Sequence, residues 1–224
     1  EGVIGNAKQM GSIMEYSIRY VKELQERYKA EQARMQYGWT DNDTKFIVGN
    51  REYNSRGSYR SVPASSATGR TMPLLTPTGT LTQWKQVINS LAVPGLEPLQ
   101  LVALAGFGAP LMQFSGVHGG TLNLLSNDSG TGKTTAGQIA LSIYGQPDGL
   151  MVKEQDTFMS REQRLGVMNN LPCLFDEMTN SDPRELSNML YSITSGRGRN
   201  RMERDSNSER VNNTSWSTIV ITNS

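Results

Sequence analysis

The first segment with a regular hydrophobic pattern runs from Ser12 to about Gln36, and it contains neither Pro nor Gly. Apolar and aromatic residues recur there every three to four positions, with Lys, Arg, Glu and Gln between them: Ile13, Tyr16, Tyr20, Leu24 and Tyr28. This spacing predicts an amphipathic helix. Two interpretations remain open, since the helix can pack its tyrosines on its own domain or form a collar that contacts neighbouring subunits.

A short β element and a linker are predicted next. Residues 44–53 predict two strands around Gly49 and Asn50, because both residues tolerate the positive φ of a tight hairpin. Residues 54–80 are rich in Ser, Gly, Thr, Pro and Arg, which is typical of an exposed loop and suggests a domain boundary. Helices are predicted over residues 82–91 and 98–112, and the second is apolar nearly all round, so we expect it to be buried.

A strand, a glycine-rich loop and a helix are predicted between residues 121 and 144. Backbone N–H groups of such a loop point at one spot beside the positive end of the helix dipole, which suits a polyphosphate. We expect Lys133 to reach the β- and γ-phosphates of ATP, and the Thr134 hydroxyl to bind Mg²⁺. The candidate nucleotide-binding residues are Asn127, Asp128, Ser129, Gly130, Thr131, Gly132, Lys133, Thr134 and Thr135.

The loop departs from the full pattern G-x-x-x-x-G-K-[ST] at one place, where Asn127 replaces the first glycine. Asparagine can still adopt the left-handed conformation, so a phosphate-binding loop remains compatible with the sequence. The alternative is an ordinary turn before a helix.

Two further apolar strands end in polar residues. Residues 171–177 end in Asp176 and Glu177, which follow Lys133 by 43 and 44 positions. We expect Asp176 to hold magnesium through its water shell and Glu177 to orient and deprotonate the attacking water, although a solvated acidic turn has the same pattern. Residues 216–224 form the other strand, and Asn223 is a candidate sensor of the γ-phosphate, although Asn also ends strands as a turn residue.

A helix predicted from Pro183 to Ser195 precedes a basic segment, residues 196–204. Planar guanidinium groups bind phosphate through paired hydrogen bonds. One of Arg197, Arg199 and Arg201 is therefore a candidate catalytic finger for a neighbouring subunit's ATP site, or several of them grip a nucleic-acid backbone. The alternative is a solvated loop.

Composition limits the possibilities further. The formal net charge of +1 does not mark a nucleic-acid-binding protein, so that possibility depends on local clusters. The single cysteine, Cys173, excludes an intrachain disulfide and fits a reducing, cytoplasmic compartment. The longest apolar run, residues 99–112, is shorter than the roughly 20 residues of a bilayer span and is broken by Gly and Pro, so we expect no membrane anchor.

Several segments give the chain a more specific resemblance. It resembles the phage and bacterial family catalogued as domain of unknown function 927, a group of P-loop ATPases found with replication proteins. The matching segments are Gly38-Trp39 leading to 46–48, residues 79–84, 109–111, 128–135, 142–145, 175–177 and 195–199.

The resemblance implies an additional-strand P-loop core, similar to superfamily 3 helicases and the broader AAA+ group. Such cores work as rings with ATP sites between subunits, and their lysine, acidic pair and sensor asparagine correspond to Lys133, Asp176, Glu177 and Asn223. The chain stops at Ser224, directly after the sensor strand, so the resemblance also predicts a core truncated at its C-terminus.

We therefore expect an α/β protein with an N-terminal helix, small β element and linker over residues 1–80, and a P-loop ATPase core with a parallel sheet over residues 81–224. The expected function is an ATP-hydrolysing motor, a phage-type replicative helicase or translocase that acts as a homo-oligomeric ring on single-stranded or forked DNA. One alternative is an ATP-dependent switch, loader or remodelling factor that does not move along DNA. A small-molecule kinase is a third possibility, disfavoured because Glu177 supplies a water-activating base.

Overall fold

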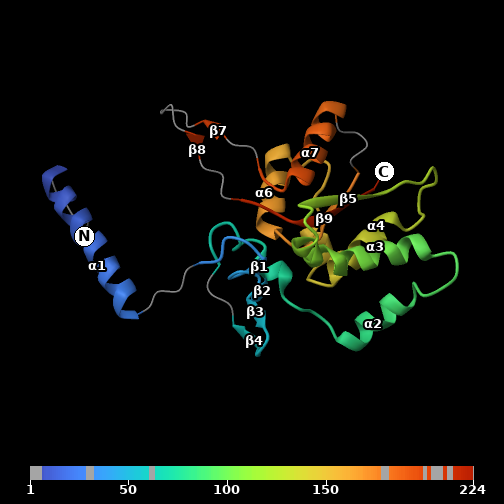
Figure 1. Ribbon diagram of the computed structural model, residues 1–224, viewed down its shortest axis with the longest axis horizontal. Coiled ribbons are helices and arrows are strands. Elements are labelled where there is room, and N and C mark those ends of the chain that lie inside the picture. The colour runs from blue at the N-terminus through green and yellow to red at the C-terminus, as the bar shows by residue number, and fades with distance from the viewer. Residues whose placement is uncertain are drawn as a thin grey trace, which may run out of the picture. The chain divides into compact units, whose positions relative to one another are not determined.

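The computed structural model describes residues 7–28, 33–60, 64–177, 182–198, 201–202, 209–210 and 214–223. The chain forms two compact units, residues 1–33 and 34–224, which are described separately (Figure 1). The β element and the segment after it belong to the same unit as the helices and strands that follow. The predicted domain boundary at residue 80, between the N-terminal part and the ATPase core, stays a prediction.

The first unit contains the helix α1 (Ala7–Tyr28). Tyr16 and Tyr20 are exposed, and their rings stack with centroids 6.1 Å apart. The predicted helix is confirmed, but its predicted end at Gln36 is wrong. Gln36 lies outside any helix, and its side-chain amide donates to the carbonyl oxygens of Gly166 and Ser215, at 2.5 and 2.7 Å.

An antiparallel meander opens the second unit, with strands β1 (Gly38–Thr40), β2 (Lys45–Val48), β3 (Arg51–Asn54) and β4 (Gly57–Arg60). The predicted hairpin around Gly49 and Asn50 is confirmed as β2–β3. The expected exposed loop over 54–80 is wrong in part. It contains β4 and the short helix η1 (Met72–Leu75), and Thr68 and Leu75 are buried.

A three-stranded parallel sheet forms the centre of this unit. Its strands are β5 (Gly119–Leu124), β6 (Cys173–Phe175) and β9 (Thr218–Asn223), in the order β5-β9-β6. Val152 extends the sheet beyond β6, since its N–H donates to the carbonyl of Leu174 at 2.9 Å. The expected α/β class with a parallel sheet is confirmed, and the carboxyl ends of all three strands meet at one edge.

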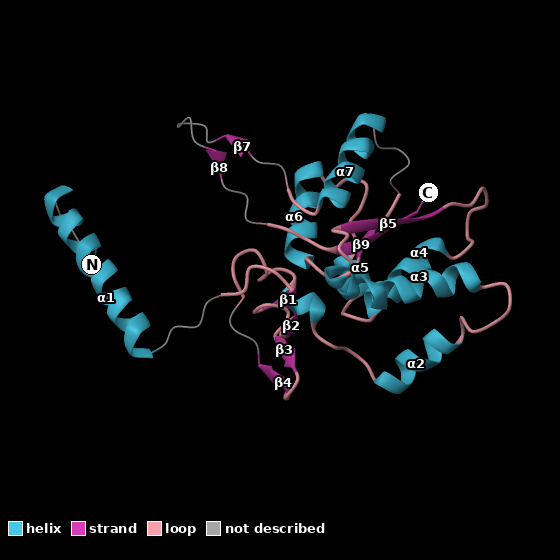
Figure 2. Cartoon of the chain, viewed as in Figure 1, coloured by secondary structure: helices cyan, strands magenta, loops and turns pink. Residues whose placement is uncertain are grey.

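Helices lie on both sides of this sheet: α3 (Glu97–Gly108) and α4 (Lys133–Ser142) on one, α6 (Phe158–Met168) and α7 (Pro183–Ser195) on the other (Figure 2). The remaining elements are α2 (Leu81–Asn89), η2 (Ala109–Phe114), α5 (Pro147–Leu150), β7 (Arg201–Met202) and β8 (Glu209–Arg210). The core between the layers is apolar, with Leu174, Phe175, Val220 and Ile221 fully buried. Burial of β6 and β9 explains their largely apolar sequences, whereas Thr121 and Asn123 of the edge strand β5 are exposed.

The expectation that α3 is buried all round is wrong for one face. Val102, Ala103 and Gly106 are buried, whereas Leu101 and Leu104 are 56% and 63% exposed. A Cβ at Gly106 would lie 2.9 Å from the carbonyl oxygen of Ala140, so the glycine permits the close approach of α3 to α4. Among the described helices, none is both long and apolar enough to cross a membrane.

Candidate functional site

The glycine-rich loop between β5 and α4 depends on two left-handed glycines. Gly130 and Gly132 have φ of 74° and 84°, and Gly132 is the N-cap residue of α4. A Cβ at Gly130 would meet no atom within 4 Å, so this glycine is required by its backbone conformation rather than by crowding. Asn127 is not among the residues with positive φ, so the left-handed conformation considered for it is not used.

Lys133 is the first residue of α4, and its side chain folds back over the loop. Its ammonium group donates to the carbonyl oxygens of Ser126 and Asp128, each at 3.3 Å. The first N–H groups of a helix have no intrahelical partner and carry the positive end of its dipole. The start of α4 therefore combines a cation with backbone donors, as an anion site requires.

Asn223 connects the other candidate residues. Its side-chain amide donates to the Asp176 carboxylate at 2.5 Å and to the Thr134 hydroxyl at 2.8 Å, while its carbonyl oxygen accepts from the Glu177 N–H at 2.8 Å. Asn223 is 3% exposed, so its amide is held in place by packing as well as by hydrogen bonds. This contact follows from the strand order, because β9 lies between β5, which leads to the loop, and β6, which leads to the carboxylates.

Glu177 has a strained backbone. Its φ is 54°, in the left-handed region that non-glycine residues rarely adopt. The side chain is exposed, in contrast to the intermediate burial of Asp176. The turn at Glu177 therefore places two consecutive carboxylates in different surroundings. Left-handed backbone at a non-glycine residue is a form of strain that is concentrated at functional sites.

Two oxygen atoms at this edge suit a hard cation. The Thr134 hydroxyl donates to the Asp176 carboxylate at 3.2 Å, which places a hydroxyl and a carboxylate oxygen side by side. No group of three or more His, Cys, Asp or Glu side chains in the described ranges could form an all-protein metal cage. The pair fits Mg²⁺, which prefers oxygen ligands and retains waters and phosphate oxygens instead of a full set of protein ligands.

Arg197 is the one candidate arginine whose side chain the structure describes, and no hydrogen bond joins it to this cluster. Arg197 is exposed and forms an isolated bridge with Ser215. Arg199 lies outside the described residues, and Arg201 is described only through its backbone pairing with Arg210. Their roles stay predictions.

Sequence reasoning missed two residues that join the strand ends. The hydroxyl of Thr222 donates to the side-chain carbonyl of Asn123 at 2.9 Å, connecting β9 to β5 one position before Asn223. Both are polar residues within otherwise apolar strands, which is the signal that could have identified them.

The only cysteine of the chain lies in β6, three residues before Asp176, and is 2% exposed. Burial raises the pKa of the Cys173 thiol to about 12. Because the thiolate is the reactive form, we expect iodoacetamide at pH 8 to modify the native chain at least about 100-fold more slowly than the urea-unfolded chain. Mass spectrometry over time measures both rates, and equal rates would show that β6 is not buried in solution.

The segments that carry the family resemblance contact one another in the structure. The indole N–H of Trp39 donates to the carbonyl of Pro110 at 2.9 Å, and that of Trp84 to the Ser142 hydroxyl at 2.8 Å. These tryptophans therefore join segments that are far apart in sequence, including four of the segments that carry the family resemblance.

No curated protein matches the chain. A family model does match, over residues 6–213, and its description is "Domain of unknown function (DUF927)". The match includes the glycine-rich loop and the acidic pair, but it ends before Asn223. Since it spans most of the 224 residues, the chain belongs to the DUF927 family.

Proposed function

We propose that this chain binds and hydrolyses ATP with a P-loop core of the additional-strand type. The observation that carries the proposal is the hydrogen-bonded cluster of Asn223 with Thr134, Asp176 and the Glu177 N–H. A nucleotide hydrolase needs a phosphate cradle, a magnesium ligand and a positioned base within one site, and this cluster supplies the connections between them.

The phosphates would bind at the start of α4. The two contacts of the Lys133 ammonium, at 3.3 Å, are longer than the usual N–H···O distance of about 2.9 Å, so phosphate oxygens compete with them at little cost. The backbone N–H groups of the loop and the helix dipole add favourable interactions with the negative charge.

Thr134 and Asp176 would hold magnesium, the first directly and the second directly or through water. When bound, the ion neutralises part of the charge that develops on the phosphate oxygens. Asn223 orients both protein groups through its amide, and its burial keeps that orientation fixed. Without this amide, the Thr134 hydroxyl and the Asp176 carboxylate would lose the donor that they share.

Glu177 would act on the attacking water. Its exposed side chain is free to accept a proton, and Asn223 fixes the backbone from which it projects. A general base at this position converts water into a nucleophile beside the γ-phosphate. Water activation favours hydrolysis over transfer to a small-molecule acceptor.

We further propose that hydrolysis drives a ring-shaped motor on single-stranded or forked DNA. Support comes from the family resemblance and from the arginines of residues 196–204. Fold and nucleotide chemistry do not specify what a motor moves, so this step depends on a nucleic-acid experiment.

The experiment is ATP hydrolysis by the chain with and without single-stranded DNA, over a range of salt concentrations. We expect DNA to raise turnover, with an apparent DNA affinity that falls steeply with salt, and Lys133→Ala to lower turnover by about 100-fold or more. Lys85→Ala, an exposed lysine on α2, is the control for loss of one positive charge. Hydrolysis that only a protein partner stimulates would favour the switch or loader, and failure of the wild type to bind ATP would contradict the proposal.

A further inference from the structure

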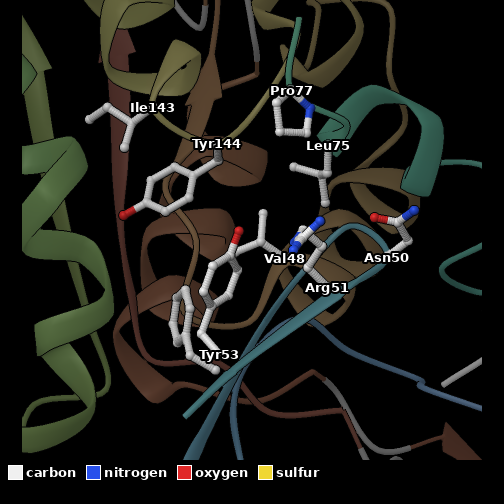
Figure 3. Close-up of a pocket in the computed structure, with 9 residues that line it drawn as sticks. Val48, Asn50, Arg51, Tyr53, Leu75, Pro77, Ile143 and Tyr144 are labelled. Atoms are coloured by element: carbon white, nitrogen blue, oxygen red, sulfur yellow. The ribbon is translucent and has the colours of Figure 1, made fainter. Parts of the chain in front are cut away.

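A cavity of about 310 Å³ lies between the meander, η1 and the segment that follows α4 (Figure 3). Three aromatic residues line it, Phe46 and Tyr53 from the meander and Tyr144 from the segment after α4. Its volume lies at the lower end of the range for small-molecule sites, about 300–1,000 Å³. A single small ligand with one ring system therefore fits its size.

This cavity is separate from the candidate ATP site. It adjoins Ile143 and Tyr144, which follow the last residue of α4, whereas Lys133 is the first residue of that helix. α4 has ten residues, so its helical rise places its first and last residues about 14 Å apart. The cavity is therefore at the opposite end of α4 from the glycine-rich loop, and an ATP molecule bound at the loop would not fill it.

Contacts within the protein hold part of the cavity wall in place. The Tyr144 hydroxyl donates to the carbonyl of Gly106 at 3.0 Å, and the Phe46 ring packs edge-on against Trp39 with centroids 4.9 Å apart. The N–H of Gln146 donates to the carbonyl of Leu74 at 2.8 Å, which ties η1 to the segment after α4. A preformed site of this kind loses little conformational entropy on binding.

Arg51 is the one charged residue among those that line the cavity. Its guanidinium donates to the hydroxyl of Ser58 at 2.8 Å, and it takes part in none of the ion pairs found among the described residues. Side chains alternate along β3, so the neighbouring Glu52 points to the other face, where it pairs with Arg34 and Lys45. The cavity therefore offers a positive charge that no neighbouring carboxylate neutralises.

We propose that this cavity binds a nucleotide unit, with its base against the rings of Tyr53 and Tyr144 and its phosphate on Arg51. Figure 3 shows both rings and the Arg51 side chain around the same space. Aromatic side chains stack on any base, and the planar fork of arginine matches a phosphate. A purely apolar ligand would not use the arginine, and inorganic phosphate would not use the rings.

Two kinds of ligand carry such a nucleotide unit: a free nucleoside monophosphate, and one nucleotide of a single nucleic-acid strand. Arg51 and Tyr53 are both exposed at the mouth of the cavity, so a strand could enter with one base and leave its backbone outside. The site does not depend on ATP hydrolysis at α4. It can therefore be tested whether or not the ATP proposal holds.

The test is photochemical cross-linking of the full chain, followed by peptide mapping. The probes are 5-iodo-deoxyuridine monophosphate and a 12-residue oligothymidylate with one 5-iodouracil, each below saturation. We expect a cross-link on an aromatic residue of the cavity, with Arg51→Gln lowering its yield about 10-fold and Tyr53→Ala lowering it by about 5-fold or more. Labelling by the free nucleotide identifies a mononucleotide site, and labelling by the oligonucleotide alone identifies a strand site.

Matched controls come from the same meander. Arg56→Gln and Tyr59→Ala change exposed residues of the same types that do not line the cavity, so we expect cross-linking within about twofold of the wild type, as is usual for surface substitutions. Cross-links that map only outside the cavity would overturn the proposal. So would equal yields for Arg51→Gln and Arg56→Gln, or competition by thymidine as strong as that by thymidine monophosphate.

Discussion

Replacing Glu177 by Gln is expected to lower kcat for ATP hydrolysis by about 1,000-fold, within the range attributed to a general base. The substitution preserves the size of the side chain and its exposed position, so it removes the proton acceptor and little else. Affinity for ATP should change by less than about threefold, because the phosphates bind through Lys133 and the loop rather than through Glu177.

Single-turnover hydrolysis and equilibrium binding of a fluorescent ATP analogue separate these two effects. Glu185→Gln, an exposed glutamate on α7, is the control for loss of one negative charge and should hydrolyse ATP as the wild type does. If Glu177→Gln kept more than a tenth of the wild-type rate, another group would have to activate the water.

The substitution Gly119→Ala is expected to lower the free energy of unfolding by about 3 kcal/mol, the upper end of the usual cost of overpacking. An added Cβ at Gly119 would overlap the carbonyl oxygen of Ile193, the third-last residue of α7. That atom belongs to the backbone, so no change of side-chain rotamer relieves the overlap. Either β5 or α7 has to move, and β5 leads directly into the glycine-rich loop.

Gly120 provides the matched comparison, one position further along β5. A Cβ there would lie 3.8 Å from the Cε of Met112, an ordinary contact, so Gly120→Ala should change the free energy of unfolding by less than about 0.5 kcal/mol. Urea unfolding followed by tryptophan fluorescence measures both, since Trp216 is buried and its indole N–H donates to the same Ile193 carbonyl. Equal stability of the two variants would contradict the close packing of β5 on α7.

The elements that local sequence determines were predicted well. The helix α7 begins and ends where expected, because Asp182 accepts from the N–H of Arg184 at its start and Gly196 adopts φ of 67° at its end. The strand order was not accessible from patterns within the chain. Pairing between β5, β9 and β6 joins segments up to about 100 residues apart, and periodicity carries no information about such pairs.

Composition predicted burial poorly in two segments, the one after Asn54 and the helix α3. The segment after Asn54 is polar and rich in turn residues, yet β4 pairs along β3 and Leu75 enters the core. For α3 the error was the opposite: its apolar sequence predicted a buried helix, but one face is exposed. Periodicity cannot show which faces of a helix a neighbouring element covers. Both errors arise from tertiary contacts that a local pattern does not encode.

Within the candidate site, the sequence predicted the residues but not the connections between them. Lys133, Thr134, Asp176 and Asn223 were each recognised from the position of a motif at the end of a strand or the start of a helix. The role of Asn223 as a sensor of the γ-phosphate stays a prediction, and its hydrogen bonds to Thr134, Asp176 and the backbone of Glu177 were not predicted. Such a contact depends on side-chain directions at three different strand or helix ends.

The left-handed backbone of Glu177 has a consequence for protein engineering. A non-glycine residue in that conformation costs about 1–2 kcal/mol, which Gly at the same position would not incur. Any redesign that ranks substitutions by predicted stability would therefore favour Gly at position 177 and would discard the carboxylate along with the strain. A thermostabilised version of this chain should keep position 177 fixed and seek its gains elsewhere.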